Sequence, residues 1–271
     1  MQKIFQPLFQ TELNYNNLEK IQQELYYNFL GNKFPKLLKA SDLTNIFKGL
    51  TFFYVIFLIY HFNLWQSQRA FLYLSIHGSY GLIWVLKSKI FPDLQFEQKM
   101  TPVSIIGGST LLSMYWYIPY SMASAMYQDQ IQDISNARLV FVIFLYVTGL
   151  FFMVGSDCQK FYQLKYKKGL ISDGFFYYSR NPNYLGECML YLAFAICAET
   201  YISYFILLFV WSTVFNINMK CKEKSLKRKD GYLEYQKHSG YILPKIFGCD
   251  KISQFLLIFM IVLFNILKFI A

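Results

Sequence analysis

Residues 139–156 read Leu139-Val-Phe-Val-Ile-Phe-Leu-Tyr-Val-Thr-Gly-Leu-Phe-Phe-Met-Val-Gly-Ser156 and contain no charged side chain. An α-helix of roughly 20 apolar residues is long enough to cross the hydrocarbon core of a bilayer, which is about 30 Å thick. An apolar run of this length therefore predicts a membrane-spanning helix rather than a strand or a surface helix.

Further apolar segments lie on both sides of this one. Together they predict an all-α, polytopic membrane protein with about seven transmembrane helices, at 47–62, 70–86, 103–126, 139–156, 184–198, 200–217 and 254–270. The composition agrees, because 55% of the residues are hydrophobic and only 15% are charged, whereas soluble domains carry about 25% charged residues. These values exclude an ordinary soluble domain and a disordered chain. Only Glu199 separates the fifth and sixth segments, which predicts a tight helical hairpin.

The lysines and arginines alternate between the two sides of this predicted topology. Seven spans place 23 of them on the side of the N-terminus and 3 on the other side. Because cytoplasmic or matrix loops are enriched in Lys and Arg, we expect the N-terminus inside and the C-terminus on the opposite side. The net charge of +10 follows from this asymmetry and suits contact with the anionic headgroups of membrane lipids, so no nucleic-acid partner is expected.

A polar N-terminal arm, residues 1–45, precedes a single transmembrane domain, residues 46–271. The arm lacks strong hydrophobic periodicity, so we interpret it as a partner-binding or interfacial segment. The two longest inner loops, 157–183 and 218–253, flank the predicted hairpin, and we expect any functional site there. None of the five cysteines forms a CxxC motif or lies near a histidine at zinc-ligand spacing, so neither a disulfide framework nor a metal site is expected.

The first of these loops ends in Arg180-Asn-Pro-Asn-Tyr184-Leu-Gly186-Glu187, which leads into an apolar segment. Asn181 is a good N-cap and Pro182 a good first helical residue. Helix N-termini attract anions and Arg180 adds a cation, so this end could hold a phosphate or carboxylate of a cofactor. A capped helix with Arg180 extended to the membrane interface explains the same residues. Glu187 lies about one turn inside the segment, where a carboxylate is costly unless it is paired.

The second loop combines clustered cations with tyrosines between Lys222 and Pro244. An amphipathic surface helix with a Glu223–Lys227 pair explains part of this stretch. A basic, aromatic loop could also close over a negatively charged cofactor. In the N-terminal half, His77 lies in the middle of the second span, and we interpret it either as a functional group or as a neutral histidine bonded between helices.

These two stretches, in this order and spacing, resemble the superfamily of isoprenylcysteine carboxyl methyltransferases, phospholipid methyltransferases and steroid 5α-reductase-like proteins. The resemblance covers about residues 165–248 and rests on Gly174, the Arg180-x-Pro-x-Tyr184-x-Gly186 core, Glu187, Glu223, Gly231-Tyr232, Tyr235 and Pro244. It implies a membrane enzyme that acts on a lipidic substrate with a nucleotide-derived cofactor, either S-adenosylmethionine or NADPH.

The resemblance also implies roles for individual residues. The residues that would line the cofactor pocket are Arg180, Asn183, Tyr184, Glu187, Glu223 and Tyr235. Arg180 would neutralise an anionic group, Glu187 or Glu223 would bind a ribose or an amine, and Tyr184 or Tyr235 would be the catalytic acid of a reductase. Many methyltransferase members have His where this chain has Asn181. Asparagine cannot act as a base or a cation, which favours the reductase-like or an uncharacterised branch, or lost activity.

Two other functions stay open at this point. A non-catalytic accessory subunit of a large membrane assembly, such as a mitochondrial respiratory complex, would keep the enzyme fold and dock on its partners through residues 1–45. A channel or transporter is disfavoured, because few charged residues lie within the predicted spans. The expected location is the endoplasmic reticulum or the mitochondrial inner membrane.

Overall fold

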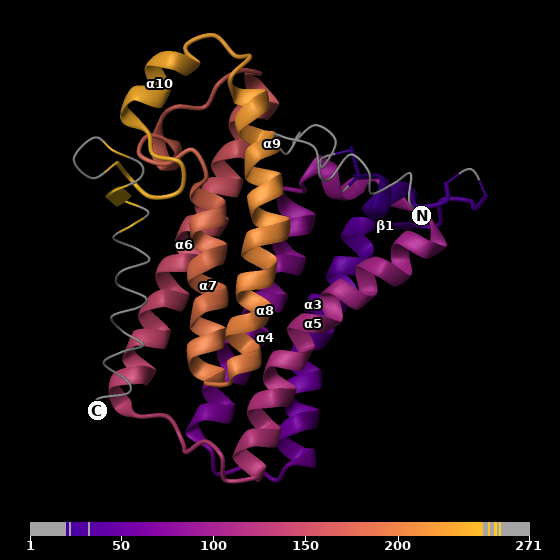
Figure 1. Cartoon of the computed structure of the whole chain (residues 1–271), viewed down its shortest axis with the longest axis vertical. Helices are drawn as coiled ribbons and strands as arrows, with labels where there is room; N and C mark the ends of the chain where they lie inside the picture. Colours follow the sequence, from indigo (N-terminus) through magenta and orange to yellow (C-terminus); the bar gives the residue numbers. More distant parts are fainter. Residues whose placement is uncertain are drawn as a thin grey trace, which may run out of the picture. The chain divides into compact units, whose positions relative to one another are not determined.

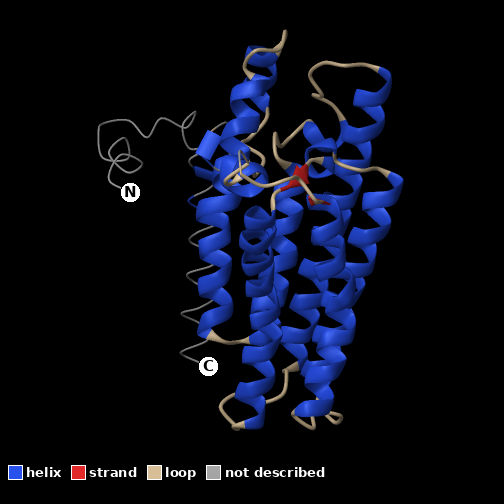
Figure 2. Cartoon of the chain, turned by 90° about the vertical axis from the view of Figure 1, so that its right-hand side faces the viewer, coloured by secondary structure: helices blue, strands red, loops and turns tan. Residues whose placement is uncertain are grey.

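The structure is a computed structural model that describes residues 20–21, 23–31, 33–245, 249, 252–253 and 255. Its elements, labelled in Figure 1, are η2 (Glu24–Asn28), β1 (Leu38–Lys39), α3 (Ala40–His61), α4 (Gln68–Ile90), η3 (Leu94–Glu97), β2 (Lys99–Met100), α5 (Pro102–Tyr127), α6 (Asn136–Tyr166), η4 (Gly174–Phe176), α7 (Pro182–Ala198), α8 (Tyr201–Val210), η5 (Trp211–Phe215), α9 (Asn216–Leu226) and α10 (Tyr232–His238). Within the described residues, helices dominate and the strands form one short pair (Figure 2). The prediction of an all-α protein is confirmed.

Six of the predicted spans coincide with helices of the structure. The sixth, 200–217, corresponds to the continuous helical run through α8, η5 and α9. Three helices are long and apolar enough to cross a membrane, namely Ala40–His61, Asn136–Tyr166 and Tyr201–Leu226. Apart from Phe255, the predicted span 254–270 lies outside the described residues, and so do residues 1–19 of the predicted arm.

The chain divides into two compact units, and each is described by itself. The first comprises Met1–Val142 and Phe194–Lys222, and the second comprises Ile143–Ala193 and Glu223–Ala271. The chain therefore passes from one unit to the other within α6, α7 and α9.

In the first unit, α3 and α4 form a closely packed antiparallel pair. A Cβ atom at Gly81 would overlap the carbonyl oxygen of Lys48, and one at Gly78 would overlap the ring of Phe52. These two glycines therefore let the helices approach more closely than larger residues would allow. The α5 helix lies beside α3 (Figure 1), and the antiparallel pairing of β1 with β2 joins the residues that directly precede these two helices.

The described part of the arm packs on its own chain. The Phe29 N–H donates to Ser104 Oγ (3.0 Å), Thr101 Oγ1 donates to the Phe29 carbonyl (2.8 Å), and Tyr27 is buried. Residues 24–29 are therefore held against the N-terminal end of α5 as part of the first unit.

Only Glu199 and Thr200 lie between α7 and α8, so the turn that the sequence predicted is short. Glu199 adopts a left-handed conformation (φ 56°), which a side chain other than glycine adopts at a cost of roughly 1 kcal/mol. Its N–H donates to the carbonyl of Ala195 (2.9 Å), which ends α7.

In the second unit, α6 and α7 meet at two glycines. A Cβ at Gly149 would lie 2.8 Å from the Gly186 carbonyl oxygen, and one at Gly186 would overlap the backbone of Met153. The glycine of the Arg180–Glu187 motif is therefore a packing residue that fixes the distance between these helices.

Candidate functional site

Three of the residues predicted to line a cofactor pocket come together in the second unit, around Arg180. This side chain is only 2% exposed. Its Nε lies 3.1 Å and 3.0 Å from the two carboxylate oxygens of Glu223. Its Nη1 donates to the carbonyl and, at 3.3 Å, to the hydroxyl of Ser239. The Tyr232 hydroxyl donates to the same carboxylate (2.5 Å). We call Arg180, Glu223, Tyr232 and Ser239 the Arg180 cluster.

Backbone pairing between residues 178–181 and 239–242 positions this cluster. The Arg180 N–H donates to the Gly240 carbonyl (2.9 Å), and the Gly240 N–H donates to the Tyr178 carbonyl (2.9 Å). Ser179 Oγ adds a hydrogen bond to the carbonyl of Ile242 (2.5 Å). The segment after α10 is thus fixed beside the start of α7, which explains how residues 59 positions apart meet at one guanidinium.

Two glutamines of α6 hold the turn that precedes the cluster. Gln159 Oε1 accepts from the Phe175 N–H (2.9 Å), and Gln163 Nε2 donates to Asp173 Oδ1 (2.9 Å). Gly174 has φ +53°, and a Cβ there would lie 2.7 Å from the Gln159 amide. The glycine that the resemblance singled out is therefore needed both for its conformation and for its lack of a side chain.

Two asparagine oxygens at the start of α7 are buried and, within the described part of the chain, have no hydrogen-bond partner. They are Oδ1 of Asn181 and Oδ1 of Asn183. Asn181 is fully buried, and its Nδ2 donates to the Tyr241 carbonyl (2.8 Å). A buried acceptor without a partner costs roughly 1–3 kcal/mol. A ligand that brings a donor to these oxygens would recover part of that free energy.

The predicted start of α7 is partly right. Pro182 is the first helical residue, and the Asn181 carbonyl accepts the first helical hydrogen bond, from Leu185 N–H (3.0 Å). The predicted side-chain cap is wrong, because Asn181 Oδ1 accepts no hydrogen bond from the described residues. The side chain is directed to Tyr241 instead, whose carbonyl binds its amide nitrogen.

Tyr235 lies beside the cluster on α10. Its hydroxyl donates to the Phe176 carbonyl (2.7 Å), which links α10 to the turn around Gly174. Burial raises the pKa of Tyr235, although the positive charge of Arg180 opposes this effect. The phenol is therefore protonated at neutral pH, and its proton is held by a backbone carbonyl rather than presented to a ligand.

The remaining predicted residues, Asn183, Tyr184 and Glu187, follow on the first turns of α7, and all three are partly exposed. Tyr232 and Ser239 are contributors that the sequence analysis did not include among the site residues. The sequence contains a feature that could have identified Tyr232, since this residue follows Gly231 and lies three residues before Tyr235 on the same helical face. No sequence feature could have identified Ser239, because it contributes mainly through its backbone carbonyl, which any residue would supply.

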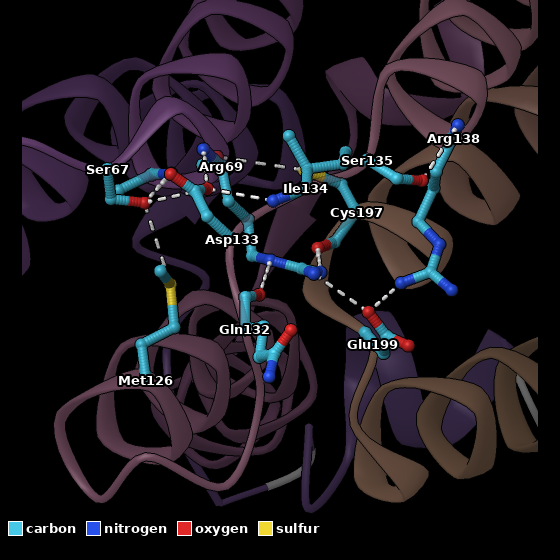
Figure 3. A network of polar contacts seen from close by, with 11 residues as sticks. Ser67, Arg69, Met126, Gln132, Asp133, Ile134, Ser135, Arg138, Cys197 and Glu199 are labelled. Carbon is cyan, nitrogen blue, oxygen red and sulfur yellow. Dashed lines mark hydrogen bonds and ion pairs between the residues drawn. The ribbon is translucent and has the colours of Figure 1, made fainter.

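A second buried Arg–Glu pair lies in the first unit (Figure 3). Arg69 is 1% exposed, and its Nη2 lies 2.8 Å from Glu199 Oε2. Its Nη1 donates to the Cys197 carbonyl (2.7 Å) and its Nε to the Gln132 carbonyl (3.0 Å). Arg138 also pairs with Glu199. The carboxylate in the turn between α7 and α8 thus compensates two arginines.

Asp133 completes this second group by capping α4. Its carboxylate accepts from the N–H groups of Gln68 (2.8 Å) and Arg69 (2.6 Å) and from Ser67 Oγ (3.2 Å). Burial alone would raise the pKa of Asp133, but these hydrogen bonds hold it below its ordinary value. We call the residues labelled in Figure 3 that carry these contacts the Arg69 cluster: Ser67, Arg69, Asp133, Arg138 and Glu199.

His77 is a packed side chain of the first unit. Its Nδ1 lies 3.0 Å from the hydroxyl of Tyr73, one turn earlier on α4. Its ring stacks on Phe194, with the ring centroids 4.4 Å apart. The structure therefore agrees with the packing interpretation of His77, although the hydrogen bond is made within its own helix. Among the described residues, no three His, Cys, Asp or Glu side chains gather where they could hold a metal ion.

Comparison with known proteins gives one match. A family model described as "Protein of unknown function (DUF1295)" matches residues 108–239, a little under half of the chain. The matched range contains the whole Arg180 cluster together with Asn181 and Asn183. No curated protein and no solved structure matches the chain.

Proposed function

We propose that this chain is a membrane enzyme that binds an adenosine-containing cofactor at the start of α7 and acts on a lipidic substrate. The observation that carries the proposal is that the buried oxygens of Asn181 and Asn183 have no hydrogen-bond partner among the residues that the structure describes. Acceptors of this kind fit a ligand with hydrogen-bond donors. The ribose hydroxyls and the adenine amino group are such donors, and S-adenosylmethionine and NADPH both carry them.

The neighbouring residues fit the same ligand. The first N–H groups of a helix have no partner within the helix, so those of α7 can face an anionic carboxylate or phosphate. When bound, S-adenosylmethionine would supply a methyl group and NADPH a hydride. Of the two tyrosines that the resemblance named, Tyr235 is disfavoured as a proton donor, because its hydroxyl donates to the Phe176 carbonyl. Arg180 contributes by orienting Glu223 rather than by a free charge.

The seven-span topology, with the N-terminus inside and the C-terminus opposite, belongs to this proposal. The lysine and arginine distribution supports it, as do the three helices that are long and apolar enough to span a membrane. The resemblance to the methyltransferase and steroid 5α-reductase superfamily supports the cofactor class and a location in the endoplasmic reticulum or the mitochondrial inner membrane.

The test begins with mass spectrometry of the small molecules that co-purify with the full chain in mild detergent. Thermal unfolding is then followed with S-adenosylmethionine, NADPH or adenosine added. We expect at least one of them to stabilise the protein, and we expect Asn181→Ala and Asn183→Ala to weaken its binding about fivefold each, as for the loss of one hydrogen bond. Asn136→Ala, an exposed position at the start of α6, is the control. Failure of all three compounds to stabilise the protein would contradict the proposal.

The second candidate function is a non-catalytic accessory subunit of a large membrane assembly, docked through residues 1–45. The full engagement of Arg180 by Glu223 and Ser239 favours it, because a retained fold with a closed site would look like this. In that case the same mass spectrometry would find only phospholipid, and the protein would migrate in a much larger particle.

A further inference from the structure

We propose that the adenine base of the cofactor stacks on an exposed group of aromatic rings in the second unit, made by Tyr177, Tyr178 and His238. We call these three residues the aromatic cluster. The inference rests on the proposed function, because it names the part of the site that would recognise the base. It gives a role to side chains that belong neither to the Arg180 cluster nor to the pair of asparagines.

The rings of the aromatic cluster contact one another although they come from two segments that are far apart in the sequence. The ring centroids of Tyr177 and Tyr178 lie 4.7 Å apart, with an angle of 85° between the ring planes. His238 is the last residue of α10, and its ring centroid lies 4.8 Å from that of Tyr177. Tyr177 is therefore the central ring, and the segment before α7 and the end of α10 together supply one continuous aromatic group.

The aromatic cluster is open to a ligand. Tyr177 is 45% exposed and Tyr178 is 62% exposed, and His238 is exposed as well. Each ring therefore keeps a surface that the protein itself does not cover. A nucleobase stacks on such surfaces, because every base has an aromatic face of its own. Stacking needs an accessible ring and not a closed cavity, so the exposure of these side chains suits this ligand.

The aromatic cluster adjoins the proposed cofactor site. The ring centroid of His238 lies 5.7 Å from that of Tyr235, and the next residue, Ser239, binds the guanidinium of Arg180. The carbonyl of Tyr178 takes part in the backbone pairing that positions Arg180. The same two segments therefore carry both the aromatic cluster and the Arg180 cluster.

The two asparagines follow the aromatic cluster closely along the chain. Asn181 comes three residues after Tyr178, so their Cα atoms are at most about 11 Å apart, a distance that an adenosine and two side chains can cover. With the base on the aromatic cluster, the ribose hydroxyls are the donors that remain for the buried oxygens of Asn181 and Asn183. The aromatic cluster would thus recognise the base, and the asparagines the sugar.

Tyrosines also collect at the interface between a bilayer and water, where they anchor a helix without binding a specific ligand. A residue with that role acts through its own contact with lipid and needs no ring from another segment. The ring of His238, however, is held beside Tyr177 by α10, and α10 is fixed to the turn before α7 by the hydrogen bond from Tyr235 to the Phe176 carbonyl (2.7 Å). The fold therefore arranges these rings as a group, which favours stacking on a base.

The test measures the affinity of the full chain in mild detergent for adenosine and for uridine by isothermal titration calorimetry. We expect Tyr177→Ala and Tyr178→Ala each to weaken adenosine binding about fivefold. Adenine has two fused rings and uracil has one, so the preference for adenosine over uridine should narrow in both variants. Tyr177→Phe keeps the ring and should bind like the parent. Tyr166→Ala removes an 80% exposed tyrosine of α6 outside the aromatic cluster and should change nothing.

Three results would overturn the inference, and they differ in what they mean for the proposed function. If adenosine binds the parent, Tyr177→Ala and Tyr178→Ala equally, the base does not stack on these rings, and the proposed function stands without the inference. If adenosine does not bind the parent, the proposed function fails and the inference fails with it. If Tyr177→Ala loses co-purified phospholipid and keeps its affinity for adenosine, the aromatic cluster is an anchor at the membrane interface.

Discussion

The two units each contain a buried Arg–Glu pair, yet the surroundings of the two pairs differ. Arg69 and Arg180 are 1% and 2% exposed, and each contacts a carboxylate and a backbone carbonyl. Around Arg69, no buried side-chain nitrogen or oxygen of the cluster lacks a partner among the described residues. Next to Arg180, two asparagine oxygens do. A buried arginine in an apolar chain is thus not itself the sign of a functional site. Buried polar groups without a hydrogen-bond partner beside the arginine are the better indication.

The difference has a structural origin. The Arg69 cluster joins the N-terminus of α4, the segment before α6 and the turn after α7, so backbone carbonyls and N–H groups supply most of its partners. The charged side chains of this cluster are therefore held by hydrogen bonds and ion pairs within the protein itself. The Arg180 cluster is also tied to the backbone, but Asn181 gives only its amide nitrogen to Tyr241, and its oxygen is left over. We therefore interpret the first cluster as structural and the second as a site.

The largest effect is expected from removing Arg69. Arg69→Ala would leave a buried polar pocket, with Glu199 still paired to Arg138. Breaking a buried ion pair costs about 3–5 kcal/mol, and we expect a loss near 3 kcal/mol in the free energy of unfolding, measured by denaturant titration in detergent. Arg138→Ala should cost less, because that side chain is 20% exposed. If Arg69→Ala unfolds like the parent protein, the cluster has no structural role and the comparison fails.

Glu199 separates the contribution of the ion pairs from that of the backbone. Glu199→Ala removes both ion pairs and keeps a Cβ at φ 56°, whereas Glu199→Gly removes the ion pairs and relieves the left-handed strain. We expect both variants to be less stable than the parent, with glycine about 1 kcal/mol better than alanine. Thermal unfolding of the three proteins measures this order. An alanine variant as stable as the parent would mean that the ion pairs contribute nothing net.

Asp133 makes the stability of the Arg69 cluster depend on pH. Its pKa is lower in the folded protein than the ordinary value of 3.8, so its stabilising contribution is present above that value and is lost as the pH falls through the folded pKa. The parent should therefore exceed Asp133→Asn in thermal stability by a constant margin at neutral pH. This margin should shrink when the pH falls below about 4. A margin that does not change down to pH 3 would show that the capping carboxylate is not the group that matters.

The sequence predicted the helices better than the clusters. Hydropathy predicted a span at 47–62, but α3 begins at Ala40. The additional residues include polar ones that the helix accommodates; the hydroxyl of Thr44, for example, donates to the Ala40 carbonyl of the same helix. The meeting of Arg180 with Glu223 followed from the resemblance, which links two distant stretches. Nothing linked Arg69 to Glu199, which are 130 positions apart. Counting charges for the topology treated both arginines of the Arg69 cluster as loop residues and could not show that one carboxylate pairs with them.

The smallest effect, and one of opposite sign, is expected at Asn183. Its Oδ1 is buried without a partner among the described residues, so Asn183→Ala removes a desolvated acceptor from the cofactor-free protein. Removing such a group is neutral or stabilising, by at most ~1 kcal/mol, whereas the same change should weaken the binding of an adenosine-containing ligand. Thermal unfolding without ligand, followed by titration with the cofactor, measures both quantities on one sample. A variant that is clearly less stable than the parent without ligand would make Asn183 a structural residue, and the Arg180 region would then resemble the Arg69 cluster.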